Sequence, residues 1–451
     1  MNLVYNVNDR PPFSKVLIFA LQQLLAILAA TIAVPSIVGH GMSQSAALFG
    51  AGAGTLVYLL FTKFKSPVFL GSSFAFLGSM FAAFGGAASV SVGYLGLLIG
   101  AVMAGLVYVI LAVIVKKAGV KWIAKLMPAT VIGPTVAIIG LSLAGNAVGD
   151  SLTSIKPVDG SYIMGAKPMI GLICALVTLG TVIVASVYGK KMMKMIPFII
   201  GIGAGYAVAA VFTVIGMIAD AEALKIINFS LFENMQWVPD FAFVEAFKGF
   251  SDLKDFGGYI GTIAVAYVPV AFVVFAEHIA DHKNLSSIIG KDLLEEPGLN
   301  NTLLGDGIGS MVGAFFGGCP NTTYGESVGC VAISGNASVI TIFVTAIMAI
   351  VASFFAPFVT LLATIPSCVM GGVCIALYGF IAVSGLKMIS KIDLSQNKNL
   401  FVVSTILVCG VGGLSLTFGK VTITTVACSL ILGILMNLLL QNAKEETKEE
   451  E

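Results

Sequence analysis

The chain has 451 residues, of which 58% are hydrophobic and only 10% are charged, and its formal net charge is +1. Soluble domains carry about a quarter charged residues, so this chain cannot cover a water-facing surface. The near-zero net charge also excludes the basic footprint of a nucleic-acid-binding protein. The apolar material instead predicts many membrane crossings, because one helical crossing needs roughly 20 apolar residues.

In chain order, apolar runs predict fourteen membrane segments, seven on either side of a polar stretch at 219–256. The first seven are expected at 14–38, 44–62, 67–85, 92–115, 122–145, 166–188 and 195–218. The second seven are expected at 257–281, 299–317, 319–334, 337–362, 366–387, 399–417 and 421–441.

The basic residues fit an even number of segments with both termini in the cytoplasm. On this topology the cytoplasmic loops hold three times as many Lys and Arg residues as the outer loops, as the positive-inside rule requires. We therefore expect a multi-pass protein of the plasma or inner membrane. The seven cysteines lack the paired spacing of a disulfide frame or a zinc site, so no metal or cofactor is predicted.

Two of the segments do not look like continuous helices. The third opens at 66–73 (SPVFLGSS) and the tenth at 317–325 (GGCPNTTYG). Each places an extended stretch before a short helix, with a Ser or Thr pair near the expected N-cap. Both are third of seven, and interrupted segments at matching positions of inverted halves indicate a transporter's central site. The alternative is a pair of ordinary helices with ragged starts.

Acidic residues inside apolar segments cost about 2.5–3.5 kcal/mol each, so Glu277 must face a partner or a cavity. Asp281 lies four residues further on, on the same helix face. Two close carboxylates resist ionising together, which is the property of a proton carrier, and His278 and His282 lie on the adjoining face. Alternatively, Glu277 is a buried structural group, and Asp281 and His282 lie at the end of the helix. Asp306 is either a helix cap or a functional group.

Glu326 falls in the first turn of the interrupted tenth segment. Backbone N–H groups are free at a helix start and can donate to a carbonyl oxygen of a ligand, while a carboxylate accepts from ligand N–H groups. This pairing suits a planar molecule with both kinds of edge. Phe74, at the start of the matching third segment, either stacks on such a ring or packs in the interior.

At these residues the chain resembles the nucleobase–ascorbate transporter family, specifically its uracil permease branch. The similar stretches are 10–12 (RPP), 70–76 (LGSSFAF), 276–278 (AEH), 291–294 (KDLL), 297–299 (PGL) and the highly specific 320–326 (PNTTYGE). The resemblance implies an all-α polytopic membrane protein with fourteen segments in two inverted repeats of seven. It further implies short antiparallel strands in segments 3 and 10, with uracil bound between them.

The same resemblance implies a division of the single transporter unit, 1–451, into two moving parts. A core would comprise 1–118 (segments 1–4) and 257–363 (segments 8–11). A gate would comprise 119–218 (segments 5–7) and 364–441 (segments 12–14). The remaining parts would be an extracytoplasmic loop, 219–256, and an acidic cytoplasmic tail, 442–451, and flat apolar gate surfaces would suit a homodimer.

Carried over by position, the resemblance implies substrate-binding roles for five residues. Glu277 and Glu326 match the two substrate-binding glutamates, Phe74 matches the aromatic residue near the ring, and Tyr324 and Gly325 supply backbone beside it.

The sequence also departs from the family pattern. Ser327 stands where an Asn is usual, and Asp281 replaces a histidine one turn after Glu277. The expected proton-coupling group is therefore a carboxylate pair, Glu277 with Asp281, and His278 is adjacent. Gln23 stands where a first-segment polar residue, often His, faces the site, and is a candidate substrate contact.

The sequence thus predicts a secondary transporter that imports a nucleobase, uracil first, by proton symport. A carrier of xanthine or another purine, or a sodium-coupled carrier, remains an alternative within the family. An anion exchanger or channel of similar architecture is the alternative from another class, although Glu277 and Glu326 would repel an anion. No nucleophile–base set that would indicate an enzyme is visible.

Overall fold

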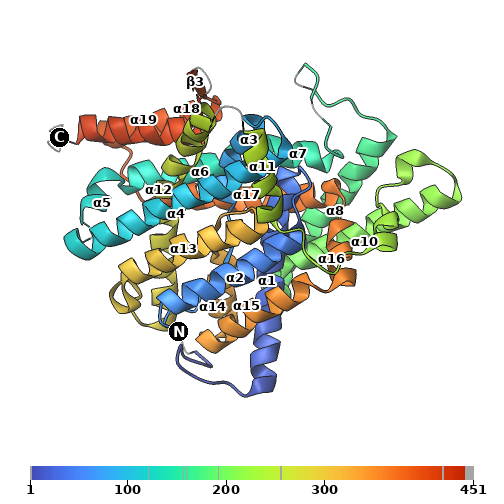
Figure 1. Ribbon diagram of the computed structural model, residues 1–451, viewed down its shortest axis with the longest axis horizontal. Coiled ribbons are helices and arrows are strands. Elements are labelled where there is room, and N and C mark those ends of the chain that lie inside the picture. The colour runs from blue at the N-terminus through green and yellow to red at the C-terminus, as the bar shows by residue number, and fades with distance from the viewer. Residues whose placement is uncertain are drawn as a thin grey trace, which may run out of the picture.

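The computed structural model describes residues 3–119, 121–155, 157–159, 161–190, 192–253, 256–418 and 421–441. The predicted tail at 442–451 lies outside these ranges. So do four of the lysines counted above in the predicted loops, which are Lys156, Lys191, Lys254 and Lys420. The described chain is mostly helical, with long helices crossing one another through the body of the molecule (Figure 1).

Eight helices of the described ranges are long and apolar enough to cross a membrane, and α6 with α7 counts as one of them. They are α1 (Phe13–Val38), α2 (Gln44–Phe61), α4 (Val90–Ala118), α6 (Ala129–Ser142) with α7 (Ala144–Ser151), α8 (Ala166–Tyr188), α10 (Pro197–Ile218), α12 (Phe256–Ile289) and α17 (Ser367–Ile389). Many outward side chains on α8 and α10, such as Ile183, Val187 and Val211, are apolar and exposed. The protein is therefore a multi-pass membrane protein.

The remaining elements are shorter. The helices are α3 (Leu77–Gly85), α5 (Lys121–Leu126), α9 (Met192–Met195), α11 (Ala242–Asp252), α13 (Leu299–Gly317), α14 (Gly325–Ser334), α15 (Val339–Ser353), α16 (Ala356–Ala363), α18 (Asn397–Val411) and α19 (Thr425–Leu440). The short 3-10 helices are η1 (Phe74–Phe76), η2 (Glu222–Leu224) and η3 (Phe229–Asn234), and η4 (Leu294–Gly298) is a short π-helix. The strands are β1 (Leu70–Ser72), β2 (Asn321–Thr323), β3 (Leu416–Phe418) and β4 (Val421–Ile423).

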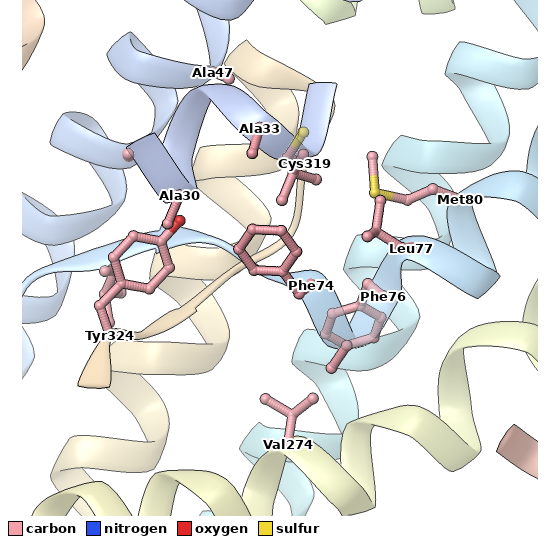
Figure 2. Close-up of a cluster of buried hydrophobic side chains, with 14 of the residues drawn as sticks. Ala30, Ala33, Ala47, Phe74, Phe76, Leu77, Met80, Val274, Cys319 and Tyr324 are labelled. Carbon is pink, nitrogen blue, oxygen red and sulfur yellow. The ribbon is translucent and has the colours of Figure 1, made fainter. Parts of the chain in front are cut away.

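The two interrupted segments meet in the interior. Strands β1 and β2 pair antiparallel, with Leu70 opposite Thr323 and Ser72 opposite Asn321. Each strand leads into a short helix, η1–α3 after β1 and α14 after β2, and Figure 2 shows the two extended stretches crossing beneath a set of buried side chains. Extended backbone at membrane depth is tolerated where it is buried in protein or lines a cavity, and both strands are fully buried.

Glycines bring α2 close enough to α13 to hold strand β2. A Cβ atom at Gly50 would lie 2.4 Å from the carbonyl oxygen of Gly313, and one at Gly54 would lie 2.6 Å from that of Gly309. Small residues allow such approach between membrane helices. The Asn321 amide then donates to the Gly50 carbonyl at 3.1 Å, so the helix pair fixes the start of β2.

Several predicted boundaries are wrong. Helix α12 continues to Ile289 instead of ending at 281. The predicted segment 337–362 is two helices, α15 and α16, bent by 81°, and Pro357 at the start of α16 favours a new helix there. The predicted segments 399–417 and 421–441 are joined by a hairpin of β3 and β4, because an apolar run with β-branched residues suits a strand as well as a helix.

Contacts between the helices fall into two groups. In one group α2, α4, α12, α13 and α15 pack on one another, and α2, α12 and α13 of this group contact β1 or β2. In the other group α6, α7, α8, α10 and α17 pack on one another. Figure 1 shows α8 and α10 at the edge opposite α4 and α12. The two groups face each other across the site described next.

Candidate functional site

A cavity of about 410 Å³ lies between the two groups of helices. One wall comes from the strand-bearing group and contains Ser73 to Ala75, residues of α12, and 322–326. The facing wall comes from α6, α10 and α17 and is apolar apart from Ser384, with Ile132, Val136, Ile139, Leu377, Phe380 and Ile381 among its members. The polar chemistry of the site therefore lies on one side.

Two carboxylates reach this cavity from one face of α12. Glu277 and Asp281 both line it, as their spacing of four residues predicts. The Thr323 hydroxyl of strand β2 donates to an Asp281 oxygen at 2.8 Å. Because α12 continues to Ile289, the alternative that Asp281 lies at a helix end is wrong.

The third carboxylate stands at the start of α14. Glu326 and Gly325 line the same cavity as Glu277, and the first N–H groups of a helix have no partner within it. A Ser or Thr pair was expected near the N-cap of this helix and of its counterpart, and the structure confirms that position for both pairs. Tyr324 is the N-cap of α14, Ser73 is that of η1, and neither side chain makes a capping hydrogen bond.

Two aromatic rings flank the strands, as Figure 2 shows for Phe74 and Tyr324. Phe74 is 9% exposed and meets Tyr378 of α17 edge to face, with ring centroids 5.9 Å apart. The Tyr324 hydroxyl donates to the Ser72 carbonyl at 2.8 Å. A Cβ atom at Gly71 would lie 2.4 Å from the Tyr324 ring, so only glycine leaves room for that ring.

Gln23 and Ser327 lie behind the strand and do not line the cavity. The Ser327 hydroxyl accepts hydrogen bonds from the Gln23 amide and, at 3.0 Å, from the Phe69 backbone N–H. Both side chains are buried. The Ser327 hydroxyl therefore connects α14 to α1 and to the residue before β1. Gln23 contacts Ser327 and does not itself line the cavity.

The two histidines of α12 are buried and also stay outside the cavity lining. His278 Nδ1 lies 2.6 Å from an Asp306 oxygen, and its Nε2 lies 3.0 Å from the Thr302 hydroxyl. His282 Nε2 lies 2.7 Å from the Tyr58 hydroxyl. Asp306 lies within α13, so it is not a helix cap. The contact between His278 and Asp306 joins α12 to α13.

Sequence reasoning missed two contacts of the site. Thr323 was expected only to lie near a helix N-cap, but its hydroxyl also donates to Asp281. Tyr378 was not singled out, because an aromatic residue in an apolar segment carries no signal of its own. Its ring packs directly against Phe74, which lines the cavity. The PNTTYGE stretch could have indicated Thr323, since it lies two residues before Gly325 and lines the same cavity.

Membrane-crossing helices that enclose a cavity with carboxylates on one wall define a class of protein, the polytopic membrane transporter. Comparison with known sequences narrows that class. Residues 14–419 match the sequence model described as the Permease family, that of xanthine and uracil permeases. The chain belongs to this family, the nucleobase–ascorbate transporters.

Relatives align over nearly the whole chain. The chain is 40% identical to a uracil permease of Bacillus caldolyticus, over 97% of this chain and 94% of that protein. It is 37% identical to a uracil permease of Bacillus subtilis, over 98% and 96%. It is 33% identical to one of Escherichia coli, over 96% and 93%. These relatives are permeases, so the chain is a transporter and not an enzyme.

Solved structures resemble the fold at low sequence identity. The transmembrane domain of the cyanobacterial bicarbonate transporter BicA matches with a TM-score of 0.65 and 16% identity, over 96% of this chain and all of that one. The murine anion transporter Slc26a9 in an inward-facing state matches with a TM-score of 0.65 and 12% identity, over 96% and 69%. At such identity the likeness establishes the fold alone.

Proposed function

We propose that the protein imports uracil by proton symport. One observation carries the proposal: Glu277, Asp281 and Glu326 line a single cavity that also contains the start of α14. The family and the named uracil permeases among the relatives support the choice of substrate. The likeness to anion transporters does not extend to the substrate, because three carboxylates in one cavity repel an anion.

Uracil is planar and alternates N–H and C=O groups around one edge. Glu277 and Glu326 accept its N–H groups, while backbone N–H groups at Gly325 donate to a carbonyl oxygen. Phe74 covers the ring, and Tyr324 holds the backbone beside it. The ligand therefore bridges both interrupted segments, and the apolar facing wall contributes burial without directional bonds.

Proton coupling follows from the carboxylate pair on α12. In the empty site a proton resides on Glu277, because the adjacent Asp281 charge disfavours a second negative charge. His278 lies on the same turn and joins this helix to Asp306. Uracil is neutral at pH 7, so its accumulation requires a coupled ion, and the carboxylate pair supplies the group that carries it.

The transport cycle rests on the architecture that the family implies. We assign fourteen segments in two inverted repeats, with segments 1–4 and 8–11 as core and 5–7 and 12–14 as gate. The two contact groups of helices support this division. Both termini are assigned to the cytoplasm of a plasma or inner membrane, and the exposed apolar faces of α8 and α10 suit lipid or a second copy of the chain.

Uptake into liposomes tests the proposal. Purified protein is reconstituted, and labelled uracil is supplied with an inward proton gradient, with an inward sodium gradient, or with neither. Uptake is expected to rise with the proton gradient alone, and unlabelled uracil is expected to compete better than xanthine. Faster uptake with sodium only, or stronger competition by xanthine, contradicts the coupling ion or the substrate respectively.

A further inference from the structure

A second, much smaller cavity adjoins strand β2 on the side of α4 and α13. Its volume is about 10 Å³, and its lining includes Tyr108 of α4, Asp306 and Ser310 of α13, and Thr322 of β2. Thr322 also lines the 410 Å³ cavity, so β2 separates the two cavities. A volume of this size corresponds to roughly one water-sized sphere.

Two buried polar atoms at this small cavity have no hydrogen-bond partner among the described residues. They are Oδ1 of Asp306 and the hydroxyl of Tyr108, and the side chains are 1% and 4% exposed. The other Asp306 oxygen is taken by His278. A buried polar atom left unpaired lowers the free energy of unfolding by more than an ordinary hydrogen bond contributes to it. We therefore expect both atoms to have a hydrogen-bond partner inside the cavity.

We propose that this cavity binds one water molecule that joins α4, α13 and β2. The Tyr108 hydroxyl donates to the water oxygen, and the water donates to Asp306 Oδ1. The hydroxyls of Ser310 and Thr322 and the amide of Asn321 are the remaining polar side-chain groups on the lining. A buried water commonly makes two to four such bonds. The water would therefore hold β2 from the side of α4 and α13. The same strand carries Thr323, which donates to Asp281.

A sodium ion is the competing occupant, because every polar side chain on this lining offers oxygen. Two features favour water. The Tyr108 hydroxyl needs an acceptor for its proton, which a cation does not provide. His278 lies 2.6 Å from Asp306 and can hold the proton that compensates the carboxylate charge, so no cation is required. The proposal does not depend on uracil or on the coupling ion.

A matched pair of tyrosine variants tests the water. Tyr267 of α12 is also fully buried with an unpartnered hydroxyl, but it does not line this cavity. Removing an unpaired hydroxyl is neutral or stabilising, whereas removing one that is bonded to water loses a hydrogen bond. Tyr108→Phe is therefore expected to lower the melting temperature of the purified full chain by about 1–2 °C, and Tyr267→Phe to leave it unchanged or raise it.

The outcomes separate the two occupants. The melting temperatures are measured in sodium, potassium and choline chloride. A fall confined to Tyr108→Phe and equal in all three salts supports water, while a fall that appears only in sodium overturns it in favour of a cation. Equal shifts in both variants also overturn it. Independently, a high-resolution density map is expected to show one peak within hydrogen-bond distance of Asp306 Oδ1, and a cavity without density contradicts the proposal.

Discussion

The two walls of the large cavity differ in how their side chains are held. On the strand-bearing wall, Asp281 is bonded to Thr323 and Tyr324 is bonded to the Ser72 carbonyl, so polar groups are tied to paired backbone. On the facing wall, α6 and α17 present mainly branched apolar side chains and a single exposed serine. The polar groups are therefore concentrated on the wall that contains the paired strands.

The contrast has a mechanical consequence. Moving a hydrogen-bonded wall breaks directional bonds whose buried partners are costly to leave unpaired. Sliding an apolar wall exchanges one set of non-directional contacts for another. For the movement of core against gate proposed above, we therefore expect displacement at the apolar surface, with the bonds around β1 and β2 kept. The following predictions test whether the two walls are as different as this account requires.

The largest effect is expected for Glu277→Gln on the polar wall. An amide cannot carry the proton and replaces a charged acceptor, so gradient-driven uracil uptake should fall by about 100-fold, the upper range for a hydrogen bond to a charged group. Uptake into liposomes measures it. Glu245→Gln is the matched control, because Glu245 lies on α11 and does not line the cavity. Normal proton-driven uptake by Glu277→Gln would refute the mechanism.

Gly71→Ala should be the next most severe change. The new methyl group would lie 2.4 Å from the Tyr324 ring, which must move and give up its bond to Ser72. Overpacking of this kind costs roughly 1–3 kcal/mol, so uracil affinity should fall by about 10-fold, measured by thermal shift against uracil concentration.

A glycine on the following helix provides the control for Gly71. A Cβ atom at Gly78 of α3 would meet nothing within 4 Å. Gly78→Ala should therefore leave affinity unchanged and slightly raise stability, because alanine favours a helix interior. Equal loss in both variants would mean that the Tyr324 ring is not the reason.

Ser327→Ala should have a moderate effect from behind the same wall. The change removes the acceptor of the Gln23 amide and of the Phe69 N–H, leaving two buried donors unpaired at a cost of roughly 1–3 kcal/mol. We expect a lower melting temperature and weaker uracil binding. Ser327→Thr keeps the hydroxyl and should retain both, and similar losses in the two variants would show that side-chain shape, not the hydrogen bonds, matters.

Much of the polar wall could be predicted from the sequence. Glu277 and Asp281 stand one helical turn apart in an apolar run, so local spacing predicts two carboxylates on one face. Glu326 lies in the first turn of an interrupted segment, and the matching positions of the two interrupted segments, with the family resemblance, bring it to the same site. The same spacing does not identify tertiary partners. His278 lies 28 residues from Asp306, and nothing in either segment indicates that the two side chains meet.

Helices and strands were predicted less well where the apolar residues show neither helical nor strand periodicity. The hairpin of β3 and β4 falls in residues expected to be helix ends, because short apolar runs with threonine suit either structure. Pro357 favours a helix start at the break between α15 and α16, but the 81° angle between the two helices depends on how they pack, which composition does not encode. Both errors lie away from the polar wall, where turn residues and charges mark the chain.

The smallest effect is expected for Ser384→Ala on the facing wall. Ser384 is the one polar side chain lining that wall, and it is exposed to the cavity side of α17. If this wall contributes only burial, loss of the hydroxyl should change uracil uptake by less than about 2-fold, as for substitutions within roughly 0.5 kcal/mol. Initial rates in liposomes measure it, with Ser384→Thr as the variant that keeps the hydroxyl. A 10-fold loss restored by threonine would place a required hydrogen bond on the apolar wall, and a wall that holds substrate by a directional bond could not slide freely past it.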